Sequence, residues 1–179
     1  MKNVGMSLSA ALLDRRNIII KRWFERLLQT YPESTTGFLS KEKDPFRNPV
    51  GHTLQEGLSA LFDGLLQSKE AASLTPVLDS IVRMRAVQDF TAAQALAFPF
   101  LLKQIIRAEL AADASRYSDE LAALETRIDE FALLAFDIFM KCREQIYELK
   151  VNEIKRRAFL SERVHQKEES SLLAKRGDP

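Results

Sequence analysis

The chain has 179 residues, of which 46% are hydrophobic and 28% charged, a composition that suits one domain with a sizeable core. Its 26 basic and 25 acidic side chains nearly cancel, which argues against a general nucleic-acid-binding protein. The single cysteine, Cys142, excludes an intrachain disulfide and a cysteine-based zinc site. Without a signal peptide or an apolar run of about 18 residues, we expect a soluble, cytoplasmic protein that does not insert into a membrane.

Helical periodicity runs through the chain and predicts an all-α bundle of about five helices. The first helix is expected from Ser7 or Ser9 to Thr30, because its apolar side chains share one face and a proline follows at position 32. Trp23, on that face, is interpreted as a core anchor.

The longest irregular connection is predicted for residues 31–47, which contain two prolines and one glycine. Phe38, Leu39 and Phe46 are expected to pin this connection to the helices. Asn48-Pro49 then supplies a cap and a first-turn proline for the second helix. That helix should extend to about position 67 and bury its leucines.

Two further start signals divide the middle of the chain. Thr75-Pro76 repeats the cap-and-proline pattern and predicts the start of the third helix. Thr91 and Gln94 have the spacing of a capping box, which predicts the start of the fourth. The fourth helix should run to about Leu110 with a kink near Ala95 to Pro99, since a proline inside a helix removes one hydrogen bond.

Arg85 and Gln88 fall within the apolar arc of the third helix. A guanidinium in a packed face needs a partner, because an unpaired buried charge costs several kcal/mol. One interpretation is a structural ion pair with Asp44, Asp63 or Asp89. The other is an anion-binding or ligand-binding site framed by Arg85 and Gln88, and the sequence leaves both interpretations open.

The last helix is expected to open at Ser118 and to reach about His165. About 48 residues at about 1.5 Å each would make it roughly 70 Å long, so its distal part should pair with a second chain or form a stalk. We therefore divide the chain into a helical domain, 1–145, and a linker-like helix with a charged tail, 146–179. Heptad spacing on this helix predicts a dimer or partner interface. Its candidate residues are Leu121, Leu124, Ile128, Phe131 and Ile138.

Catalytic and cofactor sites are not predicted. The sequence has no nucleophile in a glycine-flanked turn and no glycine-rich phosphate loop. A haem-binding globin needs an axial ligand that faces the porphyrin, but the two histidines are His52, near a helix start, and His165, in the tail. We therefore expect no enzyme activity, no metal and no cofactor.

Three segments of the chain carry a family resemblance. The segments are WFERLLQTYPESTTGF, DPFRNPVGHTLQEGLSALFDGLL and IVRMRAVQDFTAAQALAFPFLLKQIIR. Together they resemble the RsbRD-type N-terminal domain of bacterial RsbT co-antagonist proteins, the sensory part of stressosome components, and the similarity covers about residues 15 to 140.

The resemblance implies a globin-like, haem-free sensory domain that dimerises and passes a signal along a C-terminal linker helix. Family members continue into a sulfate-transporter and anti-sigma-antagonist domain, whereas this chain ends at Pro179, so we expect a stand-alone form. The favoured function is a non-enzymatic regulator, a homodimer that binds a small ligand or a regulatory protein partner. The alternative is an accessory protein that holds a ligand or cofactor in an apolar pocket between the helix that contains Pro99 and the helix that starts at Asn48.

Overall fold

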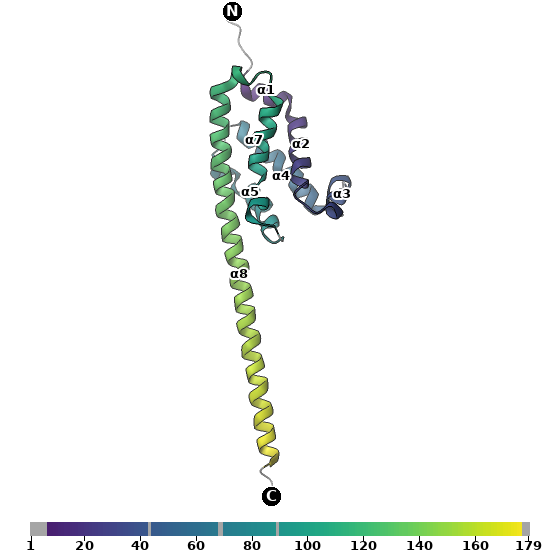
Figure 1. Cartoon of the computed structure of the whole chain (residues 1–179), viewed down its shortest axis with the longest axis vertical. Coiled ribbons are helices and arrows are strands. Elements are labelled where there is room, and N and C mark those ends of the chain that lie inside the picture. The colour runs from purple at the N-terminus through teal and green to yellow at the C-terminus, as the bar shows by residue number, and fades with distance from the viewer. Residues whose placement is uncertain (1–6, 43, 68–69, 89, 177–179) are drawn as a thin grey trace, which may run out of the picture. The chain divides into compact units, whose positions relative to one another are not determined.

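The computed structural model describes residues 7–42, 44–67, 70–88 and 90–176, and every regular element among them is helical (Figure 1). The predicted all-α fold is therefore confirmed. The chain divides into two compact units, Met1–Met140 and Lys141–Pro179. The helices are α1 (Leu8–Asp14), α2 (Arg16–Leu28), α3 (Glu33–Lys41), α4 (Pro49–Leu66), α5 (Ala71–Ala86), α6 (Ala92–Ala95), α7 (Phe98–Glu109), the 3-10 helix η1 (Ala114–Tyr117) and α8 (Ser118–Arg176).

The predicted first helix is present but interrupted at Arg15, so that it forms α1 and α2. Ser7 caps α1, since its side chain accepts a hydrogen bond from the backbone of Ala10. The Arg15 guanidinium donates to the carbonyl of Glu109 at 2.5 Å, at the C-terminal end of α7. A cation there interacts favourably with the helix dipole, which ties the interruption to the packing of α7.

The core of the first unit is centred on α2, which packs against α4 and α7. Trp23 is fully buried, and its indole N–H donates to the carbonyl of Phe98 at 2.7 Å. The rings of Trp23 and Phe98 lie 6.4 Å apart, and Phe98 meets the edge of Phe131 from α8 at 5.6 Å. The interpretation of Trp23 as a core anchor is confirmed, because its buried side chain joins α2 to α7, and Phe98 extends the contact to α8.

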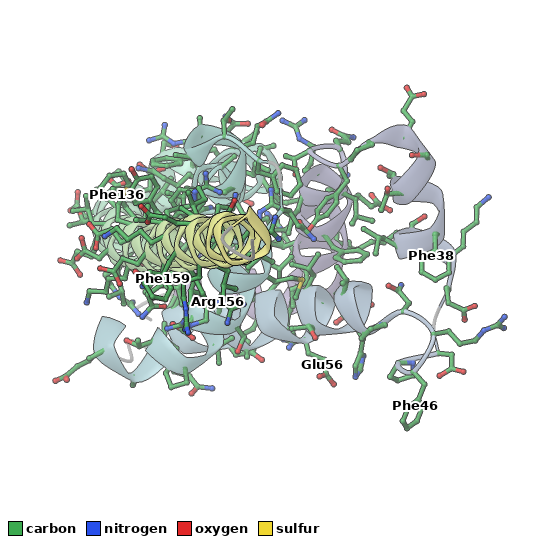
Figure 2. All side chains as sticks on the ribbon, turned by 90° about the horizontal axis from the view of Figure 1, so that it is seen from below. Phe38, Phe46, Glu56, Phe136, Arg156 and Phe159 are labelled. Carbon is green, nitrogen blue, oxygen red and sulfur yellow. The ribbon has the colours of Figure 1, made fainter. Side chains whose placement is uncertain are left out.

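The prediction of an irregular connection over residues 31–47 is wrong, since α3 occupies its centre. Glu33 lies in the first turn of α3 and Lys41 in the last, so both charges complement the helix dipole. Leu39 is buried as expected, but Phe38 is 51% exposed and Phe46 is 96% exposed. Figure 2 shows both phenylalanines at the outer edge of the bundle, so they do not pin this segment to the core.

Asn48 caps α4 as predicted and is itself buried. Its side-chain oxygen accepts from the Gly51 backbone at 2.9 Å, while its amide nitrogen donates to the carbonyls of Leu39 and Glu42. A Cβ atom at Gly51 would lie 2.3 Å from that nitrogen, so the close approach requires glycine. One asparagine therefore holds the end of α3 against the start of α4.

Replacing Asn48 with alanine is expected to lower the free energy of unfolding by about 1–3 kcal/mol, because one buried carbonyl, one part-buried carbonyl and one N–H lose their partner. Urea unfolding followed by far-ultraviolet circular dichroism measures the loss. Gln55→Ala, at an exposed position of the same helix, is the control and should change stability by less than about 0.5 kcal/mol. Equal losses in the two variants would contradict the assigned role of Asn48.

The prediction that Thr75-Pro76 starts the third helix is wrong, because α5 already begins at Ala71 and contains Pro76. The extension lets Leu74 reach the core, where it is 5% exposed. A Cβ atom at Gly64 of α4 would lie 2.3 Å from a Leu74 methyl carbon, and one at Gly57 would lie 2.7 Å from Ile81. Close packing on two glycines of α4 thus outweighs the one hydrogen bond lost at the proline.

The capping box of Thr91 and Gln94 is confirmed, but the helix that it starts is short. α6 ends at Ala95, and α7 begins at Phe98 with Pro99 in its first turn. The structure therefore has a break between two helices where a kink was predicted. A proline in the first turn loses no hydrogen bond, which makes the break less costly than a kink.

α8 begins at Ser118 as predicted and continues to Arg176. Its part in the first unit is held by the backbone N–H of Leu8, which donates to Glu120 at 2.8 Å. Lys103 pairs with Asp129 at 2.9 Å and Arg107 with Glu125 at 2.5 Å, so α7 and α8 run antiparallel. No helix of the described residues combines the length and apolar character that a membrane span requires.

Candidate functional site

Arg85 lies in the last turn of α5 and has no exposed surface. Its Nε atom donates to the carbonyl of Ala95 at 2.9 Å, and Nη2 donates to the carbonyl of Gln94 at 2.8 Å. Nη2 also donates to the hydroxyl of Thr30, just after α2, at 2.8 Å. The guanidinium therefore donates hydrogen bonds at the C-terminal end of α6, where the helix dipole favours positive charge. It joins α5, α6 and the segment just after α2.

Two aromatic rings enclose the guanidinium. Its central carbon lies 4.4 Å from the centre of the Phe90 ring and 5.1 Å from that of Tyr31. The rings meet edge to face, with centroids 5.0 Å apart. Such cation–π contacts are strongest when the cation is shielded from water, so the rings replace part of the lost hydration of Arg85. We call Thr30, Tyr31, Arg85, Gln88 and Phe90 the Arg85 centre.

The predicted ion-pair partners of Arg85 lie elsewhere or outside the described residues. Asp63 pairs with Arg16 at 2.6 Å. Asp44 is exposed and accepts a hydrogen bond from the Phe46 backbone at 2.9 Å. Asp89 is not among the described residues. Within the part of the chain that the structure describes, the hydrogen-bond acceptors of Arg85 are neutral oxygens, so they solvate its charge without neutralising it.

Three polar atoms of the Arg85 centre are enclosed but lack a hydrogen-bond partner within the described residues. They are Nη1 of Arg85, the hydroxyl oxygen of Tyr31 and Oε1 of Gln88. Buried polar atoms without partners are rare in native proteins and call for a specific explanation. Their occurrence in one cluster marks this centre as the polar site of the bundle.

The electrostatics of the Arg85 centre follow from its burial. Loss of hydration lowers the pKa of Arg85, an effect that the neighbouring Tyr31 opposes. Burial raises the pKa of Tyr31, while the Arg85 guanidinium and then the Gln88 amide act to lower it. The Tyr31 hydroxyl thus lies near both side chains, and at neutral pH it is a protonated donor.

The sequence indicates Arg85 and Gln88 but not the other members of the centre. Tyr31 directly precedes the proline that follows the first helix, and no local pattern assigns Tyr31 or Phe90 to a site. Thr30 and Arg85 are 55 positions apart in the sequence, so no local pattern indicates that their side chains meet. A buried arginine does require nearby acceptors or rings, but a single sequence does not say which ones.

The five residues predicted as a dimer or partner interface face the chain's own bundle. Each is at most 7% exposed in the single chain. Phe131, for example, packs against Phe98. These residues are Leu121, Leu124, Ile128, Phe131 and Ile138.

A different apolar surface of the first unit is exposed. Leu133, Phe136 and Met140 occupy one side of α8 at spacings of three and four residues, and they are 69%, 48% and 41% exposed. The antiparallel register set by the α7–α8 ion pairs extends to Phe100, opposite position 132, and Phe100 is 50% exposed. Figure 2 shows Phe136 projecting from this side. We call these four residues the α7/α8 face.

The cavity beside Asn48 does not lie between the two helices that were predicted to frame an apolar pocket. It has a volume of about 410 Å³ and is lined mostly by polar side chains of α2, α3, α4 and the segment before α4. No residue of α7, the helix that contains Pro99, borders it. His52, on its rim, pairs with Glu56 at 3.3 Å. Among the residues described, no group of three or more His, Cys, Asp or Glu side chains is placed to hold a metal ion.

Fold and site together define an all-helical domain with an enclosed polar centre. The chain belongs to the family of the RsbT co-antagonist protein rsbRD N-terminal domain, whose family model matches residues 18–153. The resemblance noted in the sequence is thereby confirmed, and the match extends 13 residues beyond the expected end at position 140 (153 − 140). This is a family of regulatory signalling domains and not an enzyme family.

One curated relative is an uncharacterized protein from Archaeoglobus fulgidus. It is 28% identical over 144 residues, which cover 79% of this chain and 85% of the relative. No solved structure matches the chain.

Proposed function

We propose that this chain is a non-enzymatic signalling domain, a haem-free and globin-like sensor or adaptor of the cytoplasm that acts as a homodimer. Membership of the RsbRD N-terminal family supports the regulatory role. The observation that carries the sensory part is the Arg85 centre, where a fully buried cation lies beside polar atoms that have no hydrogen-bond partner among the described residues. Ligand binding there, framed by Arg85 and Gln88, would change the links between α2, α5 and α6.

The α7/α8 face is the proposed contact between two copies. Four large, half-exposed apolar side chains present on the order of 400 Å² of surface, within the range of the largest apolar patches on soluble proteins. A stable dimer buries about 800 Å² per partner, of which slightly more than half is apolar. The face therefore supplies about the apolar area that one side of such an interface needs.

The partner copy is preferred as the occupant because the charges around the face are already matched within the chain. Lys103 and Arg107 of α7 pair with Asp129 and Glu125 of α8. Because these charges are paired within one chain, the rim of the interface is nearly neutral. A second copy with the same surface, related by two-fold symmetry, would therefore meet little charge repulsion. A regulatory protein partner would then bind the dimer at another surface.

Deletion of Lys150–Pro179 is the first test of this dimer. All four residues of the α7/α8 face remain in the truncated chain, so we expect the truncated protein to stay folded and dimeric. Light scattering after gel filtration gives the mass, and circular dichroism verifies the helical content. A folded monomer would move the contact to the deleted part of the chain and contradict this proposal.

A further inference from the structure

We propose that the Arg85 centre holds a small monovalent anion, bound by Nη1 of Arg85 and the hydroxyl of Tyr31. This inference rests on the proposed sensory function and names the chemical class of its ligand. Within the described residues, Nη1 of Arg85 and the nearby Tyr31 hydroxyl make no hydrogen bond of normal geometry, and one of these two donors belongs to a buried cation. A negatively charged acceptor can take a hydrogen bond from both donors and balance the charge of the guanidinium.

The charge of the centre favours an anion over a neutral occupant. Arg85 is fully buried, and its hydrogen bonds reach two carbonyl oxygens and one hydroxyl. These acceptors leave a net positive charge in a region of low dielectric constant, where an isolated ion is costly. A bound anion lowers that cost, whereas a water molecule supplies an acceptor without neutralising the charge.

Enclosure sets the size of the ligand. The three unpartnered atoms are buried and expose almost no surface to water, so only an occupant of a few atoms can reach them without opening the bundle. Chloride, nitrate, formate and bicarbonate have this size and carry one negative charge. Sulfate is larger and divalent, and one cation with two donors does not match its charge.

Gln88 occupies the boundary of the centre. The residue is partly exposed, yet its Oε1 atom is enclosed and has no hydrogen-bond partner in the described part of the chain. Its amide can accept from a hydroxyl-bearing anion such as bicarbonate, or turn over and donate to an anion without a proton. Gln88 is therefore the residue that distinguishes between these anions.

The test measures the melting temperature of the full-length protein against sodium chloride, nitrate, formate, bicarbonate and sulfate at constant ionic strength. Sodium gluconate, whose anion is too large for the centre, supplies the balance. We expect a saturable rise in melting temperature with at least one of the monovalent anions and no such rise with sulfate. No response to any monovalent anion beyond that to gluconate, or an equal response to sulfate, would overturn the proposal.

Tyr31→Phe tests the site itself, because it removes the hydroxyl and keeps the ring beside Arg85. The anion concentration that gives half of the maximal rise in melting temperature should be roughly tenfold higher in this variant, since a hydrogen bond to an ion is lost. Tyr117→Phe is the control, as Tyr117 is buried in η1, and it should keep the wild-type midpoint. An unchanged midpoint in Tyr31→Phe would overturn the assignment.

Light scattering on the same samples separates this inference from the proposed function. A dimer that shows no anion response would overturn the anion site and leave the homodimer standing. A monomer with a saturable, Tyr31-dependent response would support the anion site and contradict the homodimer.

Discussion

Arg85→Ala should lower the free energy of unfolding by about 3–5 kcal/mol, because truncation leaves buried polar partners without a donor and opens space between two rings. The carbonyls of Gln94 and Ala95 at the end of α6 lose their donor together. Urea unfolding reports this loss directly when it is followed by fluorescence of Trp23, the one tryptophan of the chain.

Arg83→Ala is the matched control for this experiment. Arg83 lies two residues earlier on α5, and its side chain is 51% exposed and pairs with Asp79 at 2.6 Å. Exposed pairs of this kind contribute about 0–1 kcal/mol, so its loss should stay below about 1 kcal/mol. If Arg85→Ala were no more destabilising than Arg83→Ala, the centre would have no structural role and the account of α5 and α6 would fail.

If the proposed homodimer forms through the α7/α8 face, the double substitution Leu133→Asp and Phe136→Asp should weaken self-association by at least about 100-fold and leave a monomer. Both side chains lie on the α7/α8 face, and in a two-fold interface each aspartate would be buried in both copies. Sedimentation equilibrium at several protein concentrations gives the dissociation constant.

Phe38→Asp with Phe46→Asp is the control for the loss of exposed apolar surface. These phenylalanines are at least as exposed as Phe136 but lie at the edge of the bundle near α3 (Figure 2). The control variant should remain dimeric. If it became monomeric while the variant at Leu133 and Phe136 stayed a dimer, the contact between copies would lie near α3.

Local cap chemistry explains which helix starts could be predicted. Ser7, Asn48, Thr91 and Ser118 each stand at or next to a predicted helix start, and the structure places helices there. At the first three, a side chain accepts a hydrogen bond from the backbone within three residues, so the signal is contained in a few positions.

Tertiary packing explains the predictions that failed. α5 starts at Ala71 and not at the predicted Thr75-Pro76, because Leu74 packs against Gly64 of α4. This is a contact between segments that are distant in the sequence. α3 replaced an irregular connection for a related reason, since the helix turns Leu39 into the core and leaves Phe38 outside. Local propensity does not contain these contacts.

The candidate site could be predicted in part. A charged residue at an apolar helical position indicated that Arg85 is buried, which the structure confirms. Its acceptors could not be predicted, because the carbonyls of Gln94 and Ala95 become available only where α6 ends. The expected carboxylate Asp63 pairs with Arg16, a choice set by the packing of α2 against α4.

Native mass spectrometry of the full-length protein, purified without refolding, tests the central claim most directly, because it reports subunit number in a single spectrum. A dimeric domain with its contact on the α7/α8 face predicts a main species with the mass of two chains of 20.4 kDa at micromolar concentration. A main species with the mass of one chain across that concentration range would contradict the homodimer that the proposed signalling function requires.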